Sequence, residues 1–178
     1  MFTTLLLSLT LLQPPVITKS LLPGKISRRD TTNNYIVIHN DGASLNEKTT
    51  KLVLRMRRLS YHFFINSDGK IFQFKELRNV AYHAGSTNYL GMKNWNTFSI
   101  GICLQGRDDR PYTDKQYESL SKLITYLYQR YPDSRDKPIV THADIAIPKG
   151  RKSDPGSFFD ITKLSLNKEG VWVLVMQM

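Results

Sequence analysis

The sequence predicts a single α/β domain with a central mixed β-sheet flanked by helices. Runs of β-branched and aromatic residues alternate along the chain with stretches whose apolar residues recur at helical spacing, which is the order typical of α/β folds. The chain has 178 residues and no internal repeat, so one domain is expected. With 40% hydrophobic and 22% charged residues, its composition excludes a largely disordered protein.

Residues 1–34 are expected to precede the domain. The apolar run 2–12 is too short to cross a bilayer as a helix and is similar to the core of a signal peptide. This run favours export to the periplasm or the cell exterior. It lacks a preceding cation and an Ala-x-Ala-like cleavage site, so a cytoplasmic protein stays the alternative. Residues 13–34 carry prolines and cations without clear periodicity and are interpreted as a linker.

The domain is expected to span residues 35–165 and to begin with a buried strand at 35–39. Ser44, with Glu47 three residues later, has the capping-box pattern and predicts the start of a helix. The apolar residues of this helix are expected to face the core, and they are Leu45, Leu52, Val53, Met56 and Leu59. Its cations are interpreted as a solvated face rather than a binding patch, and they are Lys48, Lys51, Arg55 and Arg58.

The remaining elements follow from turn and cap signals. Asp68-Gly69 predicts a hairpin between residues 61–66 and 70–74, and residues 98–104 read as another buried strand. Thr113 and Gln116 form a second capping box, which begins a helix that ends before Pro132. Residues 138–141 predict a short strand. The apolar tail, residues 166–178, is interpreted as an edge strand or a docked terminus.

The net charge bears on the class of binding partner, and the cysteine content bears on the cellular compartment. A formal charge of +10 favours a polyanion, such as nucleic acid, an anionic membrane surface or an anionic cell wall. The sequence has no helix-turn-helix signature, zinc-finger spacing or RNP motif, so nucleic acid is not expected as a partner. No other stretch reaches transmembrane length, so stable insertion of the domain into a membrane is not expected. Cys103 is the single cysteine and forms no internal disulfide, which is compatible with the cytosol and the periplasm.

Two histidines and one aspartate form a candidate metal site. His39 and His142 each end a predicted strand beside a loop, and Asp154 lies in the turn-rich segment 151–156. Two imidazoles and one carboxylate suit zinc and leave a fourth position for water, whose pKa falls to about 7 on zinc. The spacing matches no short metal motif, so a structural role for each histidine stays open.

Tyr61 and Lys152 are candidates for stabilising a developing negative charge. A phenol and an ammonium that face a zinc-bound water would stabilise the oxyanion of a tetrahedral intermediate. Either group would also assist proton transfer if its pKa were shifted. A tyrosine that fills the core and a solvated loop lysine are the structural alternatives.

Six stretches of the chain, in order, resemble the type 2 N-acetylmuramoyl-L-alanine amidases, the family that includes phage lysozyme-type amidases and peptidoglycan recognition proteins. They are residues 35–40, 61–69, 81–85, 96–106, 141–146 and 150–156. The resemblance covers most of the chain. It implies one zinc ion, held at the strand ends by His39, His142 and Asp154. It also implies hydrolysis of the lactyl–L-alanine amide bond of peptidoglycan or muropeptides by zinc-activated water.

The resemblance implies catalytic roles as well. It places Lys152 as the residue that stabilises the oxyanion, and in the phage lysozyme-type branch a tyrosine at the position of Tyr61 assists catalysis. The wall-recycling branch has no tyrosine there and uses a glutamate at the position of Cys103 instead. We therefore expect this chain to resemble the tyrosine-using branch.

Three residues are expected at the substrate. His83 matches a position near the family's groove, where it contacts substrate or supports the site, and a structural role is the alternative. Asn40 follows a zinc ligand and is expected to contact the stem peptide. Lys93 is the only cation in residues 91–96, where recycling enzymes carry arginines that bind the anhydro sugar. Intact wall or ordinary muropeptides are therefore expected as substrates.

His62 is expected to be structural, because in a regular strand it points to the face opposite Tyr61. The rival function is a module that recognises peptidoglycan without cleaving it. Because both histidines, the carboxylate, Tyr61 and Lys152 are all present, the sequence favours the enzyme. A monomer is expected.

Overall fold

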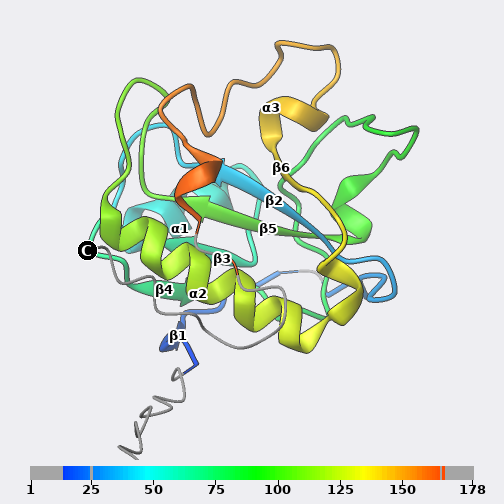
Figure 1. Ribbon diagram of the computed structural model, residues 1–178, viewed down its shortest axis with the longest axis horizontal. Helices are drawn as coiled ribbons and strands as arrows, with labels where there is room; N and C mark the ends of the chain where they lie inside the picture. Colours follow the sequence, from blue (N-terminus) through cyan, green and yellow to red (C-terminus); the bar gives the residue numbers. More distant parts are fainter. Residues whose placement is uncertain (1–13, 25, 165, 167–178) are drawn as a thin grey trace, which may run out of the picture.

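The computed structural model describes residues 14–24, 26–164 and 166, so the apolar run 2–12 and the tail 167–178 lie outside the described residues. Six strands form one sheet in the order β1-β4-β3-β5-β2-β6 (Figure 1). They are β1 (Ile17–Lys19), β2 (Tyr35–Asn40), β3 (Phe63–Ile65), β4 (Ile71–Gln73), β5 (Ser99–Leu104) and β6 (Ile139–Thr141). β3 and β4 pair antiparallel and the other neighbours pair parallel, which confirms the expected mixed sheet.

Helices cover both faces of this sheet. α2 (Asp114–Arg130) crosses the front in Figure 1, and α1 (Glu47–Met56) lies behind. A short α3 (His142–Ile145) directly follows β6, and three 3-10 turns complete the described elements, at Trp95–Thr97, Pro132–Ser134 and Ile161–Lys163. No helix among the described residues is both long and apolar enough to cross a membrane.

Alternation along the central strands separates an apolar face from the face that carries the site. Successive side chains of a strand point to opposite faces. Ile36 and Ile38 of β2, with Ile100 and Ile102 of β5, pack in the cluster that contains the apolar stripe of α2. His39, Gly101 and Cys103 therefore face the other side. The main core supports the strands from one face, and the opposite face carries two smaller apolar clusters beside the polar side chains of the site.

Local signals predicted α2 and the hairpin correctly. Thr113 and Gln116 form the expected reciprocal capping box, and the helix ends at Arg130, before Pro132. In the hairpin, Gly69 has φ +80°, and its N–H donates to the Asn66 carbonyl at 2.9 Å. A Cβ at Gly69 would also lie 2.7 Å from the Lys115 carbonyl oxygen, so both the turn and its packing on α2 require glycine.

The predicted start and inner face of α1 are wrong. Ser44 has φ 55° because the Asp41 carboxylate folds this loop by accepting the N–H groups of Ser44 and Leu45, at 3.0 and 2.5 Å. Asn46 is the N-cap, and its side chain accepts the Thr49 N–H at 3.0 Å. The helix packs through Leu54, in a cluster with Leu22, Phe64 and Phe74. The apolar residues Leu52, Met56 and Leu59 face outward instead, and the expectation for them is corrected.

This correction makes a stability prediction. Asn46→Ala removes the side-chain oxygen that satisfies a helix N–H, so the free energy of unfolding should fall by about 1 kcal/mol. Ser44→Ala is the matched control and should change it by less than about 0.5 kcal/mol, because the Ser44 side chain caps nothing. Urea unfolding followed by circular dichroism measures both, and a larger loss for Ser44→Ala would contradict the assignment.

Residues 14–24 and 26–34 are part of the folded unit, so the linker interpretation is wrong for them. β1 adds a strand parallel to β4, and Leu22 is buried. Arg29 is only 5% exposed and donates hydrogen bonds to the Leu77 carbonyl, the Asn34 side chain and the Phe98 carbonyl, at 2.9, 2.7 and 2.9 Å. Its charge made the segment look solvated, whereas its guanidinium ties the segment to two neighbouring loops.

Candidate active site

The three expected metal ligands converge at one end of the sheet. His39 lies near the carboxyl end of β2, His142 directly follows β6, and Asp154 lies in the loop after α3. His39 Nδ1 lies 3.1 Å from His142 Nδ1, and each of these nitrogens lies 3.0 Å from Asp154 Oδ2. Ligand atoms of a tetrahedral zinc site are about 3.3 Å apart, because the bonds are about 2.0–2.1 Å long. This donor set therefore fits a zinc ion.

Hydrogen bonds on the far side of each imidazole turn the Nδ1 lone pairs toward this point. His142 Nε2 lies 3.0 Å from the Ala84 carbonyl oxygen, which only accepts, so Nε2 carries the proton. His39 Nε2 lies 2.9 Å from His83 Nδ1. Metal-ligating histidines usually donate their second ring N–H in this way, which fixes the tautomer and the ring orientation.

Burial and pairing set the charges that a metal requires. Burial lowers the pKa of His39 to about 4, so the imidazole is neutral at pH 7. Burial alone would raise the pKa of Asp154, but hydrogen bonds with His142 and His39 outweigh it and hold the pKa below its ordinary value. Two neutral imidazoles and one carboxylate are the protonation states in which these side chains bind metal.

The loop that carries Asp154 is tied to the domain beside the ligand. The Pro155 carbonyl accepts hydrogen bonds from Tyr112 Oη at 2.7 Å and from the Asn40 amide at 3.2 Å. The Asp154 carbonyl accepts the Ala143 N–H of α3 at 3.1 Å. Ser153 donates to Asp108, which also accepts from the Asn40 amide. The loop is thereby positioned by β2, which carries His39, and by α3, which begins at His142.

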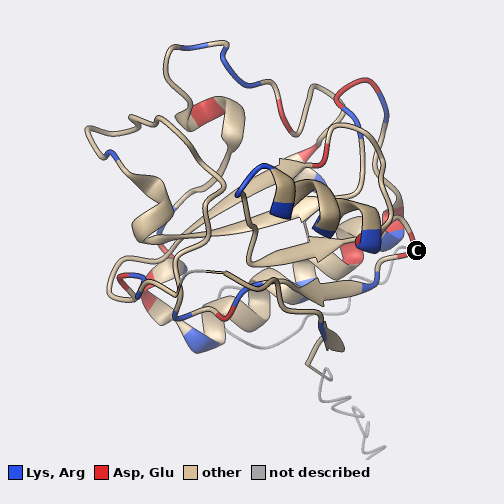
Figure 2. Ribbon diagram, turned by 180° about the vertical axis from the view of Figure 1, so that it is seen from behind, with Lys and Arg blue, Asp and Glu red and all other residues tan. Residues whose placement is uncertain are grey.

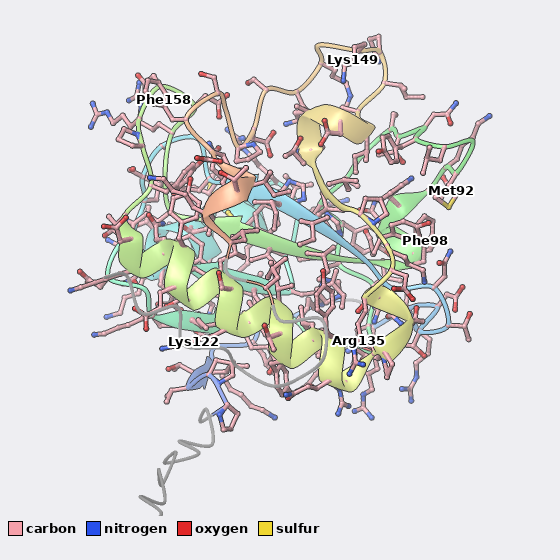
Figure 3. All side chains as sticks on the ribbon, in the orientation of Figure 1. Met92, Phe98, Lys122, Arg135, Lys149 and Phe158 are labelled. Atoms are coloured by element: carbon pink, nitrogen blue, oxygen red, sulfur yellow. The ribbon has the colours of Figure 1, made fainter. Side chains whose placement is uncertain are left out.

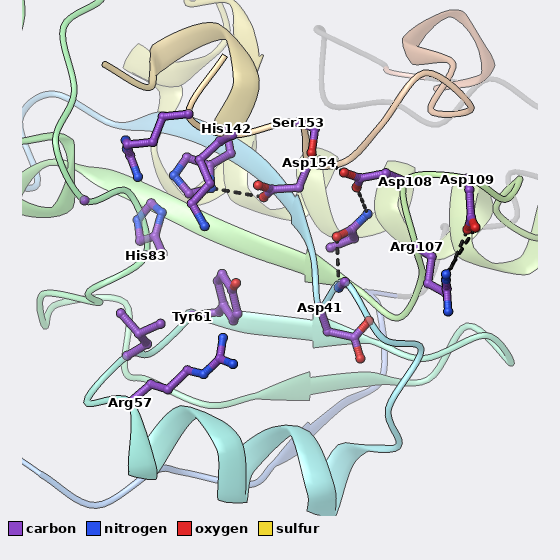
Figure 4. A pocket seen from close by; sticks show the side chains of 16 residues that line it. Asp41, Arg57, Tyr61, His83, Arg107, Asp108, Asp109, His142, Ser153 and Asp154 are labelled. Atoms are coloured by element: carbon purple, nitrogen blue, oxygen red, sulfur yellow. Dashed lines mark hydrogen bonds and ion pairs between the residues drawn. The ribbon is translucent and has the colours of Figure 1, made fainter. Parts of the chain in front are cut away.

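A cavity of about 720 Å³ opens over His142 and Asp154 (Figure 4). Tyr61 lies on the wall toward α1, across from His142 and Asp154. Its ring centroid is 5.1 Å from that of His39. Lys152 also lines the cavity, from the loop next to Asp154. Burial, reinforced by Cys103, raises the pKa of Tyr61 well above its ordinary value, so the phenol keeps its proton and is a hydrogen-bond donor at pH 7.

The three expected substrate contacts lie in different settings. His83 and Asn40 line the cavity, but their polar atoms already bind protein groups. His83 Nδ1 contacts His39, and its Nε2 lies 3.3 Å from Ser99 Oγ. The Asn40 amide donates to Asp108 and to Tyr112 Oη as well as to Pro155. Lys93 is not among the residues that line the cavity. It directly follows Met92, which is labelled at the right of Figure 3, and precedes the turn Trp95–Thr97.

His62 lies behind the site and is completely buried. Its Nε2 is 2.9 Å from the Asn79 carbonyl oxygen, and its Nδ1 accepts the Gly101 N–H at 3.1 Å. Both ring nitrogens thus bind backbone groups, as a structural histidine does.

Sequence reasoning did not single out several charged residues of the cavity. Arg57 reaches the wall beside Tyr61, while Asp41 and Asp108 line the opposite end (Figure 4). Arg151 supports the rim by donating to the Ala84 and Ser86 carbonyls, at 3.2 and 2.8 Å. The sequence could have indicated Asp41 and Arg151, because they directly adjoin Asn40 and Lys152, which were singled out. Arg57 carried none, because it is one of several cations in the same stretch.

Comparison with known proteins agrees with this geometry. The family model described as N-acetylmuramoyl-L-alanine amidase, type 2, matches residues 29–157. The chain belongs to this family. A curated relative, the 1,6-anhydro-N-acetylmuramyl-L-alanine amidase AmpD of Haemophilus influenzae, is 43% identical over 103 residues, which are 58% of this chain and 55% of that protein. The chain thus matches about half the length of the curated relatives.

Solved structures share the fold over most of this chain. A crystal structure of AmpD is 30% identical with a TM-score of 0.69, covering 83% of this chain and 92% of that one. The Escherichia coli amidase AmiD, in complex with the substrate anhydro-N-acetylmuramic acid-L-Ala-D-γ-Glu-L-Lys, is 25% identical with a TM-score of 0.66, covering 80% and 59%.

The expected export is wrong in the light of these relatives. AmpD proteins are known as cytoplasmic amidases of peptidoglycan recycling, and they are the relatives that match this chain at 43–46% identity. The physical basis of the expectation was the apolar run 2–12, which lacks the cation and the cleavage site of a signal peptide.

Proposed function

We propose that this chain is a zinc-dependent N-acetylmuramoyl-L-alanine amidase that hydrolyses the lactyl–L-alanine amide bond of muropeptides. The observation that carries the proposal is the convergence of His39, His142 and Asp154. His142 and Asp154 line an open cavity that Tyr61 and Lys152 also line. A hydrolytic zinc site needs three protein ligands and an open position next to groups that stabilise negative charge. Family membership supports the same reaction.

The side chains divide the work of such a reaction. His39, His142 and Asp154 would hold the zinc ion, which when bound lowers the pKa of its water to about 7. Lys152 provides a cation beside Asp154 for the charge that develops on the lactyl carbonyl oxygen. From the opposite wall, Tyr61 donates its phenolic O–H to the same oxygen, since its raised pKa keeps that proton in place.

A muropeptide is the substrate best supported by the relatives. AmpD is named for 1,6-anhydro-N-acetylmuramyl-L-alanine, and the AmiD complex holds an anhydro-muropeptide. Lys93 lies outside the lining of the cavity, so the chain presents no cation of residues 91–96 to the sugar. We therefore propose that it accepts anhydro and ordinary muropeptides alike. Cleavage rates on the two forms, compared at equal concentration, test this breadth.

His83 is proposed as a positioning residue. With Nε2 of His39 donating to His83 Nδ1, His83 Nε2 donates to Ser99 Oγ, and Ser99 donates to the Trp95 carbonyl. Each donor in this chain has an acceptor, so His39 is held with its Nδ1 lone pair at the metal position. Asn40 is proposed to act on the stem peptide only indirectly, through the loop that it binds.

The prediction for His83 concerns metal affinity. His83→Ala should weaken zinc binding by about 10–100-fold, because it leaves the His39 ring without its outer hydrogen bond. Gly101→Ala should act in the same direction, since a Cβ at Gly101 would lie 2.6 Å from the His83 ring. Competition with a chromophoric chelator measures zinc affinity directly. Unchanged affinity in both variants would assign His83 to substrate contact or to the fold.

The prediction for Tyr61 concerns turnover. Tyr61→Phe should lower kcat about 100-fold with little change in bound zinc, because one donor to the oxyanion is lost while all ligands remain. Tyr82→Phe is the matched control, since Tyr82 lies outside this cavity. Full turnover by Tyr61→Phe would remove the tyrosine from the mechanism.

The reaction product distinguishes an amidase from a module that only recognises peptidoglycan. Zinc-loaded protein incubated with a defined muropeptide should release the intact stem peptide, identified by mass spectrometry. Binding of the muropeptide without release of the peptide would favour the recognition module.

A further inference from the structure

The outward side of α1 carries an apolar stripe that the described fold does not cover. Leu52 and Met56 are four residues apart and therefore share one side of the helix. Leu59 lies beyond the end of α1 and also lines the edge of the active-site cavity. Their exposed fractions are 55%, 76% and 42%. Leu54, on the inner side, makes the contact with the sheet. An apolar group exposed together and flanked by charge marks an interaction surface.

Cations flank this stripe. In Figure 2, α1 faces the viewer and carries several blue positions along its length. Lys48 and Arg55 are exposed on the helix, and Arg58 follows it. Among the described residues, none of these three side chains lies within ion-pair distance of a carboxylate. Glu47, the acid of α1, is already paired with Lys51 at 3.7 Å and accepts a hydrogen bond from Ser20.

A cavity of about 380 Å³ lies beside the stripe and has the same chemistry. Leu22, Leu54 and Leu59 supply apolar walls. Arg55, Arg58 and Lys75 also line it, and its described lining contains no acidic residue. The surface therefore offers apolar contact and positive charge within one area.

We propose that this α1 surface, formed by Lys48, Leu52, Arg55, Met56, Arg58 and Leu59, docks the protein on an anionic phospholipid membrane. Helices with exposed apolar side chains beside cations lie in the headgroup layer, with the apolar groups inserted and the cations at the phosphates. A soluble polyanion such as a wall polymer would use the cations but would gain nothing from Leu52 and Met56. The contact is peripheral and requires no spanning helix.

Vesicle sedimentation of the full zinc-loaded chain tests the proposal. The wild type should bind vesicles of phosphatidylcholine and phosphatidylglycerol (3:1) and not pure phosphatidylcholine, with salt weakening the binding. Lys48→Gln/Arg55→Gln should lower the partition coefficient at least about 10-fold, because each cation near an anionic lipid surface strengthens binding about five-fold. Leu52→Ser/Met56→Ser should lower it about 10-fold as well.

Matched controls separate the surface from the net charge. Lys115→Gln/Lys122→Gln removes two cations from α2, which lies on the opposite face of the sheet (Figures 1 and 3), and should retain wild-type binding. Phe158→Ser removes an exposed apolar side chain outside α1 and should do the same. All of these residues are exposed except Lys122, which is half-buried and pairs with Glu118 on the helix surface, so circular dichroism should show an unchanged fold.

Three outcomes would overturn the proposal. The first is an absence of binding to the anionic vesicles. The second is equal weakening by the α1 and α2 charge pairs, which would reduce the effect to net charge. The third is sensitivity to the charge pair but not to Leu52→Ser/Met56→Ser, which would indicate a polyanion instead of a bilayer. Cleavage of a soluble muropeptide, assayed in parallel, should be unchanged in every variant, so this surface and the amidase activity are tested separately.

Discussion

Asp154→Ala is expected to abolish stoichiometric zinc binding and to lower amidase kcat/KM by roughly 10³-fold or more. The ion supplies several kcal/mol of transition-state stabilisation, and each 1.36 kcal/mol corresponds to a tenfold change in rate. Asp154 Oδ2 lies 3.0 Å from both ligand nitrogens, so its loss removes one corner of the site. Two neutral imidazoles alone leave the metal charge uncompensated.

The measurement combines metal analysis after dialysis with cleavage of a defined muropeptide. Asp109→Ala is the matched control, because Asp109 lines the same cavity but is exposed and pairs with Arg107 at 3.1 Å. It should retain zinc and most of the activity. An Asp154→Ala variant that kept one zinc per chain and normal turnover would contradict the ligand assignment.

Lys152→Met is expected to lower kcat by about 10²–10³-fold while leaving bound zinc unchanged. Removing one group that stabilises an oxyanion typically has this effect. Lys152 lies in the loop that carries Asp154 and lines the cavity, so its ammonium can reach the charge that develops on the carbonyl oxygen. Methionine keeps much of the side chain's length and apolar character, so the lost group is the cation.

Lys149→Met is the control for this variant. Lys149 lies three residues earlier in the same loop, at the top of Figure 3, and its Nζ donates to the Ala143 carbonyl at 3.1 Å without lining the cavity. Its kcat should be close to that of the wild type. Equal losses in the two variants would mean that the loop's conformation, and not the Lys152 cation, sets the rate.

The helices show what local sequence can and cannot predict. Thr113 and Gln116 satisfy each other's backbone groups, so α2 was predictable from neighbouring residues. The N-cap of α1 is Asn46 and not the predicted Ser44, because the Asp41 carboxylate holds the preceding loop from outside the helix. The inner face of α1 packs on Leu22, Phe64 and Phe74, and Leu22 comes from a segment whose role in the fold the sequence did not indicate.

The site shows the same division. His39, His142 and Asp154 are separated by up to 115 residues, and spacing alone matched no metal motif. Their convergence depends on the parallel pairing of β2 with β6, which places both histidines at one end of the sheet. The resemblance to the amidases supplied that long-range information. The hydrogen bonds from His83 to Ser99 and from Asn40 to the Pro155 loop arise only in the folded chain, so the sequence could not reveal them.

The most direct test of the account is metal-dependent cleavage of an anhydro-muropeptide that carries an intact stem peptide. Purified protein would be assayed as prepared, after removal of metal by a chelator, and after re-addition of zinc, with products identified by mass spectrometry. The account predicts release of a stem peptide with a free L-alanine amino terminus, its loss with the chelator, and its return with zinc. Unchanged cleavage by metal-free protein, or no cleavage of anhydro and ordinary muropeptides by zinc-loaded protein, would contradict it.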